Sequence, residues 1–246
     1  GRYLLIESSL IQFYATGGAG YRIELGSGTL SAGASIAYTY QENDFSLAID
    51  ANIQPGSPYE EKPENDAIFR AKDLSSHKIL GILGVAYETD EFRVAASYRP
   101  PLHWESEGTA EVDFPDKLSD LGPGLSDDRV TFRGSQAGSL RVGWAWESGT
   151  HPGRQHRPRY MFEVNGVWEN WSAVDNFQMK PHGNLTSSEL PNDTLPDLQS
   201  IVQPKNWQDS FSLRLGGSWG ATSWLTLHGG GMLETAAQPN SYTHTA

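Results

Sequence analysis

The chain has 246 residues, long enough for one large domain, with 18 lysine and arginine residues against 30 aspartate and glutamate residues. The net charge of -12 argues against nucleic acid as a partner, because its phosphates would be repelled. Cysteine is absent, so disulfides and thiolate metal sites are excluded as well. No apolar run approaches the roughly 18 residues of a membrane-spanning helix, although membrane β-strands need only about 10 residues with every second one apolar.

Alternation of apolar and polar residues predicts eight β-strands, and it is clearest in the run Ser-Leu-Arg-Val-Gly-Trp-Ala-Trp-Glu. Successive strand side chains point to opposite faces, so one face of this run is apolar and the other is small or charged. The expected strands cover residues 11–25, 30–40, 78–87, 92–114, 139–147, 160–169, 211–219 and 225–233. Pro100 and Pro101 remove ladder hydrogen bonds, which predicts a kink in the fourth strand.

Two regularities favour a transmembrane β-barrel over a soluble β-sandwich, which also shows alternation. Short turns near positions 26, 89, 152 and 222 alternate with long loops at 41–76, 115–128 and 172–207, as in outer-membrane barrels. Aromatic residues gather at the strand ends, typical of two interfacial girdles. We therefore predict an all-β, antiparallel transmembrane barrel in a single domain, 1–246, that is incomplete at both ends. No signal peptide is visible, so we expect a removed leader or an internal piece.

Several blocks resemble the long-chain fatty acid transporter (FadL) family of outer membrane proteins, which includes porters of toluene and other aromatic hydrocarbons. The resemblance rests on Gly-Gly-Ala-Gly-Tyr-Arg at 17–22, Gly-Ile-Leu-Gly at 81–84, Val-Trp-Glu-Asn-Trp-Ser at 167–172, and Trp-Gln-Asp at 207–209 with Leu-Arg-Leu-Gly-Gly at 213–217. Family members have fourteen strands and an N-terminal hatch. The eight strands here are similar to the fourth to eleventh, without the hatch.

The resemblance implies passive uptake of long-chain fatty acids or other hydrophobic molecules through a gated lumen, in the cell outer membrane. It also implies a monomer that contacts outer-membrane lipid and lipopolysaccharide, with no cofactor, metal or catalysis. The ligand would need apolar lumenal patches and a few cations for its carboxylate. Six residues are expected, from the alternation, to point into the lumen and are the candidates for these roles: Leu80, Ile82, Arg93, Arg99, Arg141 and Arg214. Inward arginines are also expected in the solvated ion-pair lining of any barrel.

Other motifs carry weaker hypotheses. Gly216 to Gly220 matches the G-x-S-x-G pattern, but a nucleophile elbow needs a strand-to-helix turn, and no Ser/His pair at one height stands out. His151 and His156 lack a third metal ligand. The acidic stretch at 60–66 fits a solvated loop better than a calcium site. A structural or adhesive barrel, or an outer-membrane lipase, are the alternatives. Four loop leucines, Leu185, Leu190, Leu195 and Leu198, fit either a capture groove or loop packing.

Overall fold

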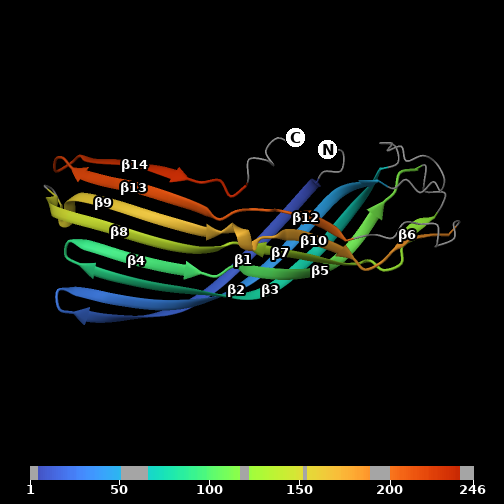
Figure 1. Ribbon diagram of the computed structural model, residues 1–246, viewed down its shortest axis with the longest axis horizontal. Helices are drawn as coiled ribbons and strands as arrows, with labels where there is room; N and C mark the ends of the chain where they lie inside the picture. The colour runs from blue at the N-terminus through green and yellow to red at the C-terminus, as the bar shows by residue number, and fades with distance from the viewer. Residues whose placement is uncertain (1–4, 51–65, 117–121, 152–153, 189–199, 239–246) are drawn as a thin grey trace.

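The computed structural model describes residues 5–50, 66–116, 122–151, 154–188 and 200–238, and nearly all of them lie in one antiparallel sheet (Figure 1). Twelve strands make up this sheet, and β6 and β11 form a separate two-stranded sheet. The described residues include one short complete helix, the three-residue 3-10 helix η2, Trp171–Ala173. None of their helices is long and apolar enough to cross a membrane.

The strands run up and down in chain order. Their bounds are β1 Leu5–Leu25, β2 Gly28–Asp50, β3 Asp66–Thr89, β4 Phe92–Arg99, β5 Leu102–Asp113, β6 Pro123–Leu125, β7 Arg129–Gln136, β8 Gly138–His151, β9 Arg154–Asn170, β10 Asn176–Pro181, β11 Leu185–Ser187, β12 Ile201–Pro204, β13 Ser210–Gly220 and β14 Thr226–Glu234.

Several of these strands are consecutive parts of one longer ribbon. Both β4 and β5 pair with β3, and they are separated by Pro100 and Pro101, the expected kink. In the same way β8 and β7 pair with β4 and β5, β9 and β10 pair with β8 and β7, and β13 and β12 pair with β9 and β10. The eight predicted strands therefore exist as eight ribbons.

The ribbons extend further than the sequence predicted. The expected loop at 41–76 is strand at both ends, because β2 continues to Asp50 and β3 begins at Asp66. The expected loop at 172–207 contains β10, β11 and β12. These parts carry polar and charged residues on one face, a composition that is typical of loops when the sequence is considered alone.

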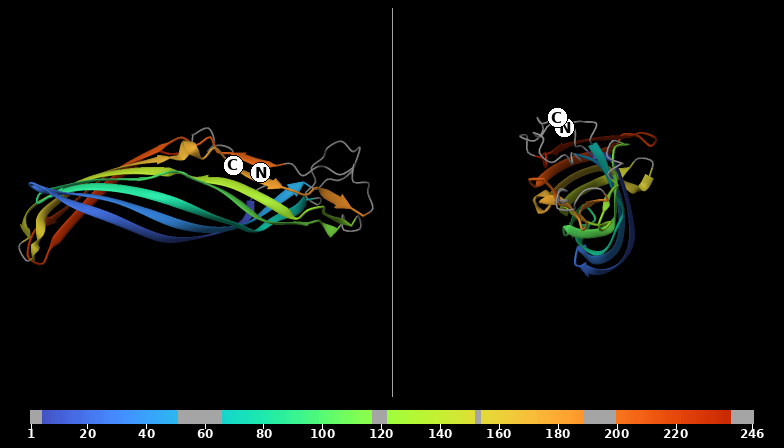
Figure 2. Two further views of the ribbon diagram at one scale, coloured as in Figure 1. Left: turned by 90° about the horizontal axis from the view of Figure 1, so that it is seen from below. Right: turned by 90° about the vertical axis from the view of Figure 1, so that its right-hand side faces the viewer.

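The sheet is curled into a trough about its long axis (Figure 2). Phe45 of β2 and Phe132 of β7 lie 4.8 Å apart between ring centroids, although β3 and β5 separate their strands in the sheet. Such a contact is possible only on the concave face, which we call the lumenal face. Within the described residues β1 and β14 are not paired with each other, so the trough is open.

We call the half of each ribbon that is nearer the short turns the lower segment, and the outer face of this segment is apolar. Large apolar side chains are exposed there: Ile11, Phe13, Tyr21, Ile36, Tyr38, Ile79, Leu83, Tyr98, Leu140, Trp144, Trp146, Phe211, Leu213 and Trp219. The aromatic members lie at the two ends of this lower segment, as two interfacial girdles require. The lumenal face of the same strands carries mostly small, polar or charged residues, with Leu80 and Ile82 as large apolar exceptions.

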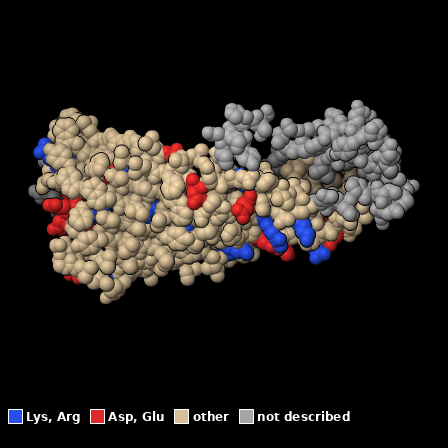
Figure 3. Space-filling model, viewed as in Figure 1, with Lys and Arg blue, Asp and Glu red and all other residues tan. Residues whose placement is uncertain are grey.

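We call the half nearer the long loops the upper segment. Here the two faces are reversed, so that the lumenal face is apolar and the outer face is charged. The lumenal face there is a packed hydrophobic core, made by Phe69, Ala71, Leu74, Ala110, Val130, Phe132 and Met179. The outer face carries ion pairs, Lys72 with Glu111, Arg70 with Asp113 and Arg133 with Glu105. Figure 3 shows charged side chains over the half of the molecule that carries β5 and β7, and again at the short-turn end. The upper segment is therefore built to stand in water, and the level of Tyr40 and His77 marks the edge of the apolar band.

Where the lower and upper segments meet, some strands contain one extra residue, which shifts the alternation of their side chains by one position. In β3 a bulge beside Asp73, which has φ 56°, places Ala71 and Leu74 in the same core. Between β4 and β5 the extra residue lies at the two prolines. In β3, for example, the lumenal residues change from even to odd numbers between Leu74 and Ala71, although both side chains lie on the lumenal face.

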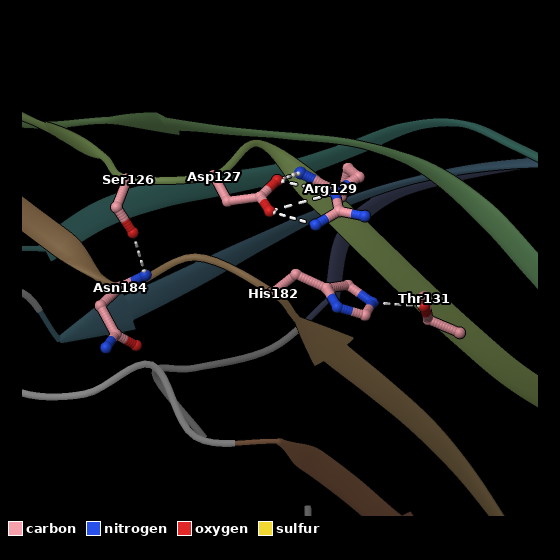
Figure 4. A network of polar contacts seen from close by, with 6 residues as sticks. All are labelled: Ser126, Asp127, Arg129, Thr131, His182 and Asn184. Atoms are coloured by element: carbon pink, nitrogen blue, oxygen red, sulfur yellow. Dashed lines mark hydrogen bonds and ion pairs between the residues drawn. The ribbon is translucent and has the colours of Figure 1, made fainter.

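The two small strands join distant loops at the upper end (Figure 4). The Ser126 amide donates to the Asn184 carbonyl and the Asn184 amide to Ser126 Oγ, both at 2.9 Å. His182 Nε2 lies 2.7 Å from Thr131 Oγ1. Arg129 binds both carboxylate oxygens of Asp127, and these hydrogen bonds lower the pKa of Asp127 to about 2.

Candidate functional site

Arg141 and Arg214, two of the predicted ligand residues, reach the same strand from opposite sides. Arg141 on β8 pairs with Val167 of β9, and Arg214 on β13 pairs with Asn165, two residues away on the same face. The sequence placed both arginines inward by parity, and the register shows that they share one stretch of the lumenal wall.

These two arginines line one hollow of about 350 Å³. Its other polar residues come from four strands: Ser97, Asn165, Glu169, Ser210, Ser212 and Glu234. Within the described residues neither Arg141 nor Arg214 belongs to any of the ion pairs. Glu169 is already engaged, because it accepts hydrogen bonds from Trp171 Nε1 at 3.1 Å and Ser210 Oγ at 3.4 Å. The two guanidinium groups can donate hydrogen bonds to an anion, although Glu169 and Glu234 balance their charge in the same hollow.

Gly143 keeps this hollow open at one side. A Cβ atom at this position would clash with the side-chain oxygen of Asn165. A larger residue there would therefore displace the Asn165 side chain. Asn165, Glu169 and Glu234 were not predicted as ligand residues, although their inward parity is readable from the alternation.

The other predicted residues lie elsewhere. Arg93 forms an ion pair with Glu88 at 2.6 Å, and Arg99 Nη2 donates to the Ala137 carbonyl at 3.0 Å, so both cations are engaged in the wall. Leu80 is lumenal and buried. Ile82 borders a second, mostly apolar hollow of about 650 Å³, lined largely by glycine, alanine and serine residues of β1 to β4. The predicted residues thus lie in separate places, and only two of the arginines, Arg141 and Arg214, meet.

The alternative motifs find little support. The register does place Ser218 opposite His228, contrary to the expectation that no such pair exists. No hydrogen bond joins the two in the described structure, however, and Ser218 lies on a hairpin strand without the helix that an elbow needs. Leu185 is buried in β11, which is loop packing. The side chains of His151 and His156, residues 60–65, Leu190, Leu195 and Leu198 lie outside the described part. The described residues contain no cluster of three or more histidine, aspartate or glutamate side chains that could hold a metal ion.

The sequence of the chain is similar to one known family of outer-membrane proteins. The family described as "Outer membrane protein transport protein (OMPP1/FadL/TodX)" matches residues 1–245. The chain belongs to this family. Among curated proteins, none is similar enough in sequence to count as a match. The predicted FadL resemblance, the all-β barrel fold and the outer-membrane localisation are therefore confirmed at the level of the family.

Three solved structures of FadL-like proteins illustrate the shared fold. A Pseudomonas aeruginosa FadL homologue is 17% identical with a TM-score of 0.66, over 95% of this chain and 51% of its own length. The Ralstonia pickettii toluene transporter TbuX is 16% identical with a TM-score of 0.60, over 93% and 56%. The CymD monoaromatic hydrocarbon channel is 16% identical with a TM-score of 0.62, over 94% and 61%. The chain thus spans little more than half the length of these FadL-like relatives.

Proposed function

We propose that this chain is the wall of a passive outer-membrane transporter for long-chain fatty acids or similar hydrophobic carboxylates. The observation that carries the proposal is the pair Arg141 and Arg214, two lumenal cations in one hollow without an ion pair in the described structure. A carboxylate binds such guanidinium groups through charge-assisted, often bidentate hydrogen bonds. An apolar tail would lie against the lumenal wall toward Ile82.

Transport of this kind needs no chemical step. The ligand moves down its own gradient, and binding at the arginine pair must be favourable enough for entry and weak enough for release. Val142 and Gly166 contribute backbone to the same hollow and add apolar surface. Such a wall works as a monomer, with its apolar outer face in contact with membrane lipid and its upper segment among lipopolysaccharide headgroups.

A neutral hydrocarbon is the second candidate ligand. The hollow bordered by Ile82 is larger and mostly apolar, and two of the similar structures are described as a toluene transporter and a monoaromatic hydrocarbon channel. A small aromatic molecule would need no cation there. The two candidates predict opposite responses to loss of the arginine charges.

Uptake by whole cells tests the proposal. The full-length protein is expressed in a Gram-negative strain that lacks its own fatty acid transporter, and uptake of labelled fatty acid and labelled toluene is compared. We expect faster fatty acid uptake than in the empty strain, and a slower rate with Arg141→Gln plus Arg214→Gln. Faster toluene uptake alone would favour the hydrocarbon candidate. No uptake of either would favour the structural or adhesive barrel.

A further inference from the structure

The side chain of Asn165 borders the hollow that holds Arg141 and Arg214, and Glu163 fixes its orientation. Glu163 is the preceding lumenal residue of β9 and lies outside the lining of the hollow. Asn165 Nδ2 donates a hydrogen bond to Glu163 Oε1. A carboxylate can only accept hydrogen bonds, so the amide nitrogen has to face Glu163. The amide oxygen is therefore the group that Asn165 presents to the hollow.

Gly143 makes room for this oxygen. It pairs directly with Asn165 from the neighbouring strand β8, and it also borders the hollow. A Cβ atom added at Gly143 would overlap with Asn165 Oδ1, so the oxygen occupies the place where other residues carry a side chain. Within the described ranges no group donates a hydrogen bond to Asn165 Oδ1, and the side chain is half-buried. Asn165 thus offers the hollow an uncharged acceptor that the protein does not itself satisfy.

The two arginines adjoin this acceptor on the same face. Arg214 of β13 pairs directly with Asn165, and Arg141 pairs with Val167, the next lumenal residue of β9. Guanidinium groups can only donate hydrogen bonds. The Cβ atoms of directly paired residues are about 5 Å apart. A single small head group can therefore reach the arginines with its acceptor atoms and Asn165 with a donor.

The charges of the hollow favour an uncharged donor. Its lining carries two arginines and two glutamates, Glu169 and Glu234, so that the charges cancel. The Glu234 carboxylate forms no ion pair in the part of the chain that the structure describes. An ammonium group would be drawn to that carboxylate rather than to the neutral amide. A hydroxyl or an amide N–H suits the Asn165 oxygen, because a neutral hydrogen bond needs no opposite charge.

An ordinary fatty acid meets only half of these requirements. Its ionised carboxylate has acceptor atoms alone, so it can bind the arginines but leaves the Asn165 oxygen unmatched. A 2-hydroxy fatty acid carries a hydroxyl on the carbon next to the carboxylate. An N-acyl amino acid carries an amide N–H on the same carbon. Both heads combine the acceptors that the arginines bind and a neutral donor for Asn165.

We propose that Asn165 is a specificity-determining residue of this hollow, which selects amphiphilic carboxylates with a neutral hydrogen-bond donor on the carbon next to the carboxylate. Glu163 is the positioning residue, because it acts through the Asn165 amide and lies outside the lining. This inference rests on the proposed function and narrows the substrate class of the same site.

Displacement of a fluorescent long-chain fatty acid from the full-length protein in detergent tests the inference. Four competitors of equal alkyl length are compared: the fatty acid, its 2-hydroxy acid, the N-acylglycine and the fatty alcohol. The test variants are Asn165→Leu, which removes the acceptor at similar size, and Glu163→Ala, which removes the partner of the amide nitrogen. Glu163→Gln is the rescue variant, because its carbonyl oxygen can still accept from Asn165 Nδ2. The control is Gly81→Ala, at an outward glycine with open space around an added Cβ.

The unaltered protein is expected to bind the donor-bearing acids about two- to tenfold more tightly than the fatty acid, as one neutral hydrogen bond would provide. Asn165→Leu and Glu163→Ala should reduce this ratio to about one with little change for the fatty acid itself, and Glu163→Gln should restore it. The ratio within one protein does not depend on the fraction that is folded. A preference for only one of the two donor-bearing acids supports the inference and identifies the donor.

Equal affinities for the three acids in the unaltered protein would overturn the inference, and so would a preference that survives in Asn165→Leu. A preference that survives in Glu163→Ala would overturn the role of Glu163. The proposed function is tested separately by Arg141→Gln plus Arg214→Gln, which should weaken the binding of all three acids but not of the alcohol. If that variant loses acid binding while the unaltered protein shows no preference among the acids, the proposed function stands and the inference falls. Absence of acid binding to the unaltered protein would overturn both.

Discussion

Arg141 and Arg214 lie opposite Val167 and Asn165 of the one strand between them, so two guanidinium groups from different hairpins face a single hollow. The same register sends Leu140 and Leu213 to the other face, where both are exposed. Function and membrane anchoring are thus set by neighbouring residues of the same strands.

The assignment of faces predicts the labelling of single cysteines. Leu213→Cys should react with a lipid-soluble reagent in intact membranes, and Arg214→Cys only with a water-soluble one, because adjacent strand residues face opposite sides. Glu107→Cys, outward but in the upper segment, should behave like Arg214→Cys. Equal reaction of Leu213→Cys and Arg214→Cys with both reagents would contradict the assignment.

A charge on the apolar outer face should impair membrane insertion. Leu140→Arg is expected to cost about 2 to 4 kcal/mol if Leu140 is near the bilayer midplane and less toward its rim. Urea-dependent folding into lipid vesicles measures this difference, with Leu140→Met as the control of similar size. A cost equal to that of the methionine variant would argue that this face does not meet lipid.

The upper core should contribute to stability as a core in a soluble protein does. Phe132 is 7% exposed and contacts Phe45 and Phe177, so Phe132→Ala should lower the free energy of unfolding by about 3 to 5 kcal/mol. Phe211, which is 57% exposed on the outer face, provides the comparison, and Phe211→Ala should cost clearly less. Similar losses in the two variants would mean that the upper lumen is not packed.

The pair Asp127 and Arg129 predicts a pH dependence at the upper end. The pKa of Asp127 is lowered to about 2, mainly by hydrogen bonds from the Arg129 side chain and then from its backbone amide. The stabilisation is therefore complete above the ordinary carboxyl pKa of about 4 and is lost as the pH falls toward 2. The stability difference between the unaltered protein and Arg129→Gln should shrink over this range. A difference independent of pH, as expected for the control Lys180→Gln, would exclude the linkage.

Much of the wall could be predicted from alternation alone. The lower strands, their apolar outer face and the inward position of Arg141 and Arg214 all follow from a period of two. Register is a property of strand pairing, so the sequence did not reveal that these two arginines meet while Arg93 is held by Glu88. Nor does an inward position say which arginines remain without an ion pair.

The upper segment was missed for physical reasons. Its outer face carries residues such as Lys72 and Glu111, which pair across strands but resemble loop composition when read singly. The bulge at Asp73 and the two prolines then reverse the parity of alternation. Gln41 and Ser76 fell within an expected loop for the same reasons.

The central claim is that the lumenal arginines bind a carboxylate, and the most direct test is the affinity of the full-length protein in detergent for a fluorescent long-chain fatty acid. Arg141→Gln plus Arg214→Gln should weaken this binding about tenfold or more, since hydrogen bonds to charged groups contribute about 1.5 to 3 kcal/mol. Arg93→Gln, which removes a cation already paired with Glu88, is the matched control. Binding of the fatty alcohol should not change. Equal affinity for the acid in the double variant and the unaltered protein would contradict the claim.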